Sequence, residues 1–354
     1  MSKKIFGMIA VVMVSAMLFA ACAPAATQAP AAPAATEAPA APAATEAPAA
    51  PAAKTPVEVF SWWTTGGEAN GLQKLIDQFN AAHPDAEVIN AAVAGGAGSN
   101  AKAVLKTRML GGDPPDSFQV HMGHELLDTW VKTGYMEPLD DVYKQYGFND
   151  VFAPGVLAIV SDQGHPYSVP VNIHRANVLW YNKDVFDKNG IKAEDLATFE
   201  GFKAVAEKLK AAGITPLALG DNGPWAATNL FETVLIGTLG ADKYKGLWDC
   251  TTDWSGPEVK QAIENYKMML GYINSDHTAL SWDQANQLVI DGKAAMTVMG
   301  DWANGDYTAK NFTGYGWAPP PGNKGIFDAL SDSFGLPKNT KNPALMKEPS
   351  SFPG

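Results

Sequence analysis

The stretch "VEVFSWWTTGGE", Val57 to Glu68, opens the folded part of the chain and decides its fold. Val57 to Trp62 alternates as a β-strand does. Apolar residues at helical spacing then follow, namely Leu72, Leu75, Ile76 and Phe79. The pattern predicts a strand, a loop and a helix. Because neighbouring side chains of a strand point to opposite faces, a core on one side can absorb only one of the two indoles of Trp62 and Trp63.

The same alternation recurs along the chain. A second strand is predicted at Ala86 to Ala94, a helix from about Asn100 to Leu110, and a third strand at Ser117 to Met122. Farther on, Thr198 is a plausible N-cap of a helix, a strand is predicted at Pro216 to Leu219, and Ser281 to Asp291 and Ala294 to Met299 predict another helix and strand. This order is typical of an α/β protein with mainly parallel sheets.

Two segments favour crossings between two lobes. The extended run "YSVPVNIHRANVLWYN", 167 to 182, is rich in β-branched and aromatic residues, and "YGWAPPPG", 315 to 322, is too rich in proline for a central strand. Two crossings between two α/β lobes would make a hinge, with a cleft between the lobes. Such clefts are favoured ligand sites.

The N-terminus has the layout of an export signal. Lys3 and Lys4 precede an apolar run from Ile5 to Ala20, and "FAAC" ends at Cys22. This tetrapeptide resembles a bacterial lipobox, which predicts a signal peptide at 1–21 and lipidation of Cys22; an ordinary cleaved signal is the alternative. Residues 22–55 are nearly all Ala, Pro, Thr and Glu and predict an extended tether. We therefore expect an extracytoplasmic protein that is anchored to a membrane by its lipid only.

Charge and cysteine content exclude several classes of protein. The net charge is −11, and loss of Lys3 and Lys4 with the signal would make it −13. This acidity argues against nucleic acid or anionic lipid headgroups as partners. After lipidation of Cys22 only Cys250 would remain, so no intrachain disulfide is expected and packing must stabilise the fold. Residues 56–354 are numerous enough for two lobes with substantial cores.

Three loops carry tryptophan beside polar groups: "SWW" at 61–63, "LSWDQ" at 280–284 and "MGDWA" at 299–303. Indole faces suit the C–H faces of a pyranose, and carboxylates and amides suit its hydroxyl groups. The polar candidates are Glu68, Gln119, His121, Asp301 and Asp332.

Five motifs together resemble the solute-binding proteins of carbohydrate ABC importers, most closely the glucose- and mannose-binding branch. They are "EVFSWWTTGGE", "VLKTRMLGGDPPDSFQVHMGHEL", "YSVPVNIHRANVLWYNKDVF", "GKAAMTVMGDWA" and "LSDSFGLPK". The resemblance implies a two-lobed, type II periplasmic-binding fold with lobes at 56–168 and 169–320 and a return to the first lobe at 321–354. It implies a sugar site of Trp62, Trp63, Glu68, Gln119, His121, His174, Trp282, Asp301, Trp302 and Asp332. His174 and Arg175 match a motif near the hinge.

The resemblance also implies a way of working: a monosaccharide stabilises the closed form, which presents it to permease subunits, while the chain itself is a monomer without cofactor, metal or catalysis. After Lys338, where the family normally continues, this chain reads "NTKNPALMKEPSSFPG". These residues lose apolar periodicity, so no helix is predicted there. We expect a truncated second lobe and return segment, with core faces exposed on both lobes.

Three other interpretations compete with sugar binding. "GAGSNA" at 96–101, followed by Asp116, fits a dinucleotide-binding pattern, but an exported protein has little access to such a cofactor. His121 and His124 could hold a metal, but no third ligand lies nearby in the sequence. An exported glycosidase could use Glu68, Asp301 and Asp332 as its acids, and release of sugar from a glycoside would favour it.

Overall fold

The computed structural model describes residues 53–348, which lie within one compact unit. The predicted signal peptide, Cys22 and nearly all of the predicted tether lie outside the described residues. Across 53–348, no helix is both long enough and apolar enough for a membrane crossing.

A five-stranded sheet forms the first lobe, in the order β2-β1-β3-β13-β6. Its strands are β1 (Thr55–Phe60), β2 (Ala86–Asn90), β3 (Ser117–His121), β6 (Ser168–Pro170) and β13 (Asp332–Gly335). β1 runs parallel to β2 and β3, as the alternating pattern predicts. β13 is antiparallel to both β3 and β6, because it returns from the second lobe. The sheet is therefore mixed and not mainly parallel.

A four-stranded sheet forms the second lobe, in the order β11-β8-β10-β9. Its strands are β8 (Leu179–Asn182), β9 (Thr215–Ala218), β10 (Ala294–Val298) and β11 (Tyr315–Ala318). Only β9 and β10 are parallel. The expectation that "YGWAPPPG" is wholly a crossing is wrong, since its first four residues are the edge strand β11. An edge position and a proline run that starts only after the strand make this possible.

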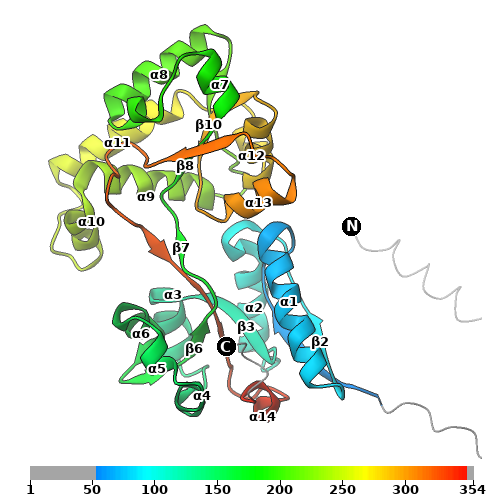
Figure 1. Cartoon of the computed structure of the whole chain (residues 1–354). Coiled ribbons are helices and arrows are strands. Elements are labelled where there is room, and N and C mark those ends of the chain that lie inside the picture. Colours follow the sequence, from blue (N-terminus) through cyan, green and yellow to red (C-terminus); the bar gives the residue numbers. More distant parts are fainter. Residues whose placement is uncertain (1–52, 349–354) are drawn as a thin grey trace, which may run out of the picture. The chain divides into compact units, whose positions relative to one another are not determined.

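Helices cover these sheets (Figure 1). In the first lobe they are α1 (Gly66–Ala82), α2 (Ser99–Leu110), α3 (His124–Leu126), α4 (Asp140–Tyr146), α5 (Phe148–Val151) and α6 (Pro154–Val160). In the second they are α7 (Lys183–Lys188), α8 (Phe199–Ala211), α9 (Trp225–Leu239), α10 (Ala241–Trp248), α11 (Pro257–Leu270), α12 (Trp282–Ile290) and α13 (Ala303–Ala309). The predicted cap is confirmed: the Thr198 side chain accepts a hydrogen bond from the Gly201 amide at 3.0 Å.

Each lobe has its own apolar core. Phe60, Leu105, Phe118 and Leu126 belong to the core of the first lobe, and Leu179, Phe202, Leu217 and Leu235 belong to that of the second. The short ribbon of β4 (Ser161–Asp162) and β5 (His165–Pro166) lies near α6. Because the two cores are separate, each lobe can keep its packing while the link between them changes.

Two crossings link the lobes, and a short ribbon of two-residue strands pairs one crossing with the other. The run 167–182 is divided into β6, β7 (His174–Arg175) and β8, and β7 pairs with β12 (Ala329–Leu330) of the return segment. Figure 1 shows β7 between the elements of the two lobes. Asn177 ties the crossings together: its Nδ2 donates to Asn323 Oδ1 at 2.9 Å, and its Oδ1 accepts from the Asp328 amide at 3.0 Å.

The described return segment ends in α14 (Pro343–Met346), where no helix was predicted. Asp116 explains this one turn, since its carboxylate accepts from the Asn342 amide at 2.9 Å and from Thr340 Oγ1 at 2.5 Å. These contacts depend on tertiary structure and leave no periodicity in the sequence. Met346 also lines an apolar groove of about 210 Å³ beside Leu72, Phe79 and Phe334.

Asn177→Ala tests the tie between the crossings. It would leave buried donors and acceptors without partners, so we expect the free energy of unfolding to fall by about 2 kcal/mol, measured by urea denaturation. Asn149→Ala makes the same chemical change at an exposed position of α5 and should be nearly neutral. Equal effects of the two substitutions would contradict a structural role for Asn177.

Candidate functional site

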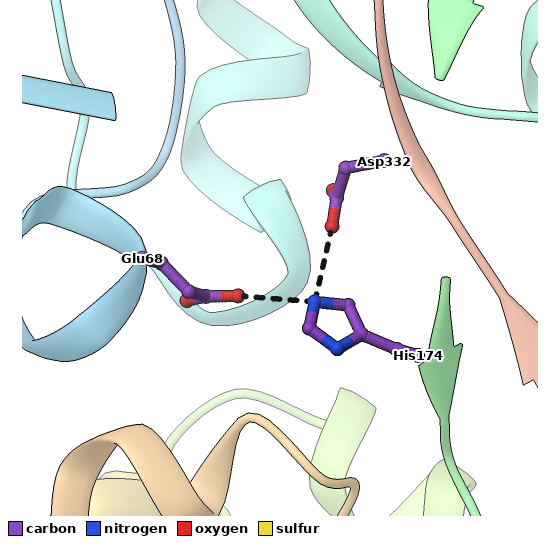
Figure 2. A group of neighbouring side chains, drawn as sticks. All are labelled: Glu68, His174 and Asp332. Atoms are coloured by element: carbon purple, nitrogen blue, oxygen red, sulfur yellow. Dashed lines mark ion pairs between the residues drawn. The ribbon is translucent and has the colours of Figure 1, made fainter. Parts of the chain in front are cut away.

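Glu68, His174 and Asp332 converge from three elements far apart in the sequence (Figure 2). Glu68 lies in the first turn of α1, His174 in β7, and Asp332 at the start of β13. His174 Nε2 lies 3.9 Å from Glu68 Oε1 and 3.7 Å from Asp332 Oδ2. One ring nitrogen therefore faces two carboxylates of the first lobe.

Asp301 fixes the orientation of the His174 ring. It follows β10 in the second lobe, and its Oδ1 lies 2.5 Å from His174 Nδ1, while its Oδ2 accepts from the Arg175 amide at 3.0 Å. Because Nδ1 is committed to Asp301, Nε2 is the nitrogen that remains for a ligand. The Arg175 side chain instead bonds Asn177 and the Ile326 carbonyl, so it supports the hinge.

Two amide side chains, one from β3 and one from the crossing between β6 and β7, hold the buried carboxylate of Asp332. Gln119 Nε2 donates to Asp332 Oδ1 at 2.7 Å, and Asn172 Nδ2 donates to Oδ2 at 2.9 Å. Gln119 Oε1 in turn accepts from the Trp62 amide at 3.1 Å. Asp332 is therefore fixed in position, which suits a group that must recognise the direction of a hydroxyl.

The charges of this cluster alter two pKa values. Burial, and then the nearby charge of Asp332, raise the pKa of Glu68 to about 7, although His174 and His121 partly offset them. Burial lowers the pKa of His174, but the hydrogen bond to Asp301 and the surrounding carboxylates outweigh it and raise this pKa overall. The site therefore holds protons near neutral pH.

A second polar group lies beside the first. His121 Nε2 is 3.6 Å from Asp332 Oδ1, and its Nδ1 is 2.9 Å from Glu125 Oε2, which Lys102 Nζ also contacts at 2.7 Å. Although burial raises the pKa of Glu125, His121 and Lys102 outweigh burial and lower it, so that this carboxylate is charged. Lys102 and Glu125 thus orient the ring of His121.

The two indoles of the doublet have different surroundings. Trp63 is only 6% exposed and packs with Leu72, Ile76 and Phe334. Trp62 is partly buried; its ring meets His121 edge to face at 5.0 Å, with Lys102 Nζ 5.3 Å from its centre. One ring thus enters the core, although β1 ends at Phe60 and the two indoles lie in the loop before α1, so the predicted strand is two residues too long. Trp63 is therefore a core residue, whereas Trp62 keeps part of its ring exposed beside His121.

Three partly buried indoles belong to the second lobe: Trp225, Trp282 and Trp302 all pack against the same apolar cluster. The ring of Trp302 meets that of His174 at 5.4 Å and 83°, and that of Trp225 at 6.2 Å. Trp302 therefore joins the cluster around His174. Trp282 begins α12, where Ser281 and Gln284 form a capping box.

All six polar residues of the predicted site meet in one network: Glu68, Gln119, His121, His174, Asp301 and Asp332. Sequence reasoning missed Lys102, Glu125, Asn172 and Trp225. Two of these residues lay close to the second recognised motif: Lys102 precedes its start at Val104 by two residues, and Glu125 lies within it. Trp225 follows "NGP" at the start of a helix, a position that could have drawn attention to it.

Other ligands can be weighed on the same geometry. Donor atoms of Glu68, His174 and Asp332 lie within 4.8 Å of one another, so these three residues could hold a cation. His121 and His124 instead face separate acids, Glu125 and Asp128. The loop at Gly96 supports the Trp225 ring, and both oxygens of Asp116 accept hydrogen bonds from the protein. That loop and Asp116 therefore serve the fold and not a ribose.

Comparisons with known proteins agree on one family. Residues 63–348 match the model described as bacterial extracellular solute-binding protein. The chain is 40% identical over 301 residues to an uncharacterized ABC transporter extracellular-binding protein of Pyrococcus horikoshii, covering 84% of this chain and 67% of that protein. It is 33% identical to a probable sugar-binding periplasmic protein of Rhizobium meliloti, covering 84% of this chain and 71% of that protein.

Among solved structures, the chain is similar to the bacterial solute receptor AcbH, whose described preference is for β-D-galactopyranose. The TM-score is 0.73 at 24% identity, over 83% of this chain and 74% of that one. At this identity the likeness concerns the fold, and the predicted α/β periplasmic-binding architecture is confirmed.

The raised pKa of Glu68 predicts a pH dependence of stability. The folded chain binds this proton more tightly than an unfolded chain with the ordinary pKa of 4.5, so Glu68 makes the free energy of unfolding fall as pH rises from about 4.5 to about 7. His174, whose pKa is also raised, acts in the same direction above its ordinary value of 6.5.

Glu68→Gln removes the contribution of the Glu68 carboxyl to this pH dependence. The free energy of unfolding of the variant, relative to that of the wild type, should therefore increase as pH rises from about 4.5 to about 7. Urea denaturation at several pH values measures this. Glu264→Gln, at a side chain 64% exposed on α11, is the control and should parallel the wild type. Parallel profiles for Glu68→Gln and the wild type would contradict the raised pKa.

Proposed function

The chain belongs to the family of bacterial extracellular solute-binding proteins, and on that premise we propose that it binds a monosaccharide of the glucose or mannose type between its lobes. It is a sugar-binding component of an ABC importer and not an enzyme. The glycosidase alternative is thereby set aside. That the ligand is a monosaccharide of the glucose or mannose type is our proposal, and the carboxylates and indole rings of the site support it.

The observation that carries the proposal is the convergence of one buried and one partly buried carboxylate with indole rings. Asp332 and Glu68 can accept hydrogen bonds from hydroxyl groups, His174 Nε2 can donate or accept, and Trp62 and Trp302 stand beside them. A pyranose presents hydroxyls at its rim and C–H groups on its faces. Fixed acceptors beside aromatic surface match both features.

Binding would favour the closed arrangement of the lobes. A sugar that contacts Glu68 and Asp332 of the first lobe and Trp302 of the second gains contacts that an open form cannot offer together. A ligand shifts such an equilibrium only by this difference in affinity. The permease subunits of the importer would then receive the sugar from the closed protein.

The arrangement of the whole chain is also a proposal. We infer a signal peptide at 1–21, lipidation at Cys22, a tether at 22–55, lobes at 56–168 and 169–320, and a return segment at 321–354. The relatives support an extracellular or periplasmic location. A lipid on Cys22 would keep the receptor near its permease, and we expect it to act as a monomer.

Calorimetric titration with a panel of monosaccharides tests the sugar assignment. We expect D-glucose or D-mannose to bind the wild type, and Trp62→Ala to weaken affinity by about tenfold or more. Its melting temperature should fall only modestly, because Trp62 packs against the core but is partly exposed, whereas Trp63 is buried in it.

Trp317→Ala is the matched control, since this indole is 57% exposed on the edge strand β11. It should bind as the wild type does. If no monosaccharide binds the wild type, the proposed ligand is wrong. If Trp62→Ala loses stability and affinity together, its ring belongs to the core.

A further inference from the structure

The glycine loop Gly95–Gly98 supports two indoles that come from different lobes. A Cβ placed on Gly98 would lie 2.6 Å from Trp62 of the first lobe, and one on Gly96 would lie 1.9 Å from Nε1 of Trp225 in the second. Both distances are well below van der Waals contact. At Gly96, therefore, the lobes meet with a ring directly on the backbone.

A second close approach joins the lobes beside the carboxylate cluster. Gly67 of α1 and Gly305 of α13 face each other: a Cβ on Gly67 would lie 3.1 Å from the Gly305 Cα, and one on Gly305 would lie 3.3 Å from the Gly67 Cα. Gly67 immediately precedes Glu68, and α13 follows Asp301 and Trp302. A wider separation here would draw Glu68 away from His174.

Backbone conformation does not account for these glycines. Gly95 and Gly98 have φ of +148° and +73°, which favour glycine. Gly67, Gly96 and Gly305 are outside that region, so an alanine could adopt their backbone without strain. At these three positions, atoms of the other lobe occupy the space that the methyl group of an alanine would need.

We propose that Gly96 and Gly305 determine how closely the two lobes approach, with Trp225 as the positioning residue that seats on Gly96. The lack of side chains at these contacts lets Glu68 of α1 reach His174, whose ring Asp301 of the second lobe holds. The consequence for sugar affinity rests on the proposed function, whereas the geometry of closure does not. The glycine-rich motif that resembles a dinucleotide loop thus acquires a role as a closure contact.

The two positions should differ in severity. The atom that an alanine at Gly96 would strike belongs to the Trp225 ring, which is itself packed against Trp302 at 6.2 Å and cannot turn freely. The overlap there exceeds 1 Å by ordinary contact distances, since carbon atoms rest at about 3.5–4.0 Å. At Gly305 the neighbour is backbone, but a shift of a few tenths of an ångström relieves the contact.

Distances between spin labels measure closure without requiring a sugar. In the full chain with Cys22→Ser, one label is placed on the exposed Cys250 of the second lobe and one on Lys144→Cys, an exposed position of α4 in the first. Double electron–electron resonance then gives the distribution of distances between the two labels for each variant, with and without D-glucose.

Gly96→Ala should deplete the short-distance population strongly and Gly305→Ala moderately. Gly71→Ala is the matched control: it lies on α1 like Gly67, its backbone is not left-handed, and its Cβ would meet open space. It should give the wild-type distribution. Adding Trp225→Ala to Gly96→Ala removes the overlap and should restore the short distances.

If D-glucose binds, Gly96→Ala should weaken its affinity about as much as the closed population falls, for instance tenfold for a tenfold depletion. Melting temperatures of the single variants should stay near that of the wild type, because both cores are intact. If no sugar binds, the proposed function fails, while the sugar-free distances still decide the closure contact.

Two results would overturn the inference. One is a distance distribution for Gly96→Ala and Gly305→Ala that equals that of Gly71→Ala. The other is a wild-type chain with no short-distance population under either condition, since the contacts seen at Gly96 and Gly305 would then not form in solution.

Discussion

The hydrogen bond between Asp301 and His174 Nδ1 organises the site. His174 lies on a strand of only two residues, so secondary structure alone would leave its ring free to turn. With Nδ1 held at 2.5 Å by a carboxylate of the second lobe, Nε2 faces the acids of the first. The same imidazole thus relates the two lobes and presents the cluster of Figure 2 to a ligand.

The carboxylates of Glu68 and Asp332 lie beside imidazoles and amides, so the cluster carries little excess negative charge. Asp332 is hydrogen-bonded by the amides of Gln119 and Asn172, and its only basic neighbours among the described residues are the imidazoles of His121 and His174. Burial raises the pKa of Glu68 to about 7, so this carboxyl is partly protonated near neutral pH. A carboxylate surrounded by amides recognises neutral donors such as hydroxyls, whereas a guanidinium partner would favour anions. The site is therefore suited to an uncharged polar solute.

Local patterns predicted the elements that local interactions form. The apolar stripe of α1 and the Thr198 cap needed only neighbouring residues, and both are present. The strand predicted at Val57 to Trp62 is also present as β1, although it ends at Phe60. Trp225 and Asn172 were missed because they join the site through contacts with Gly96 and Asp332, which no spacing records. The mixed sheet of the first lobe and α14 likewise depend on the return of the chain to that lobe. The recognised motifs predicted much of the polar network, but not which indole of the doublet would be buried.

The order of strands in the first lobe has a consequence for synthesis of the chain. β13 lies between β3 and β6, so residues 332–335 must be made before this sheet can close, whereas residues 179–318 supply the whole sheet of the second lobe. As the polypeptide emerges with its N-terminus first, the lobe encoded later can finish folding first. Until then, the edges of β3 and β6 remain unpaired and open to association, which makes this nascent stage one that chaperones are suited to protect.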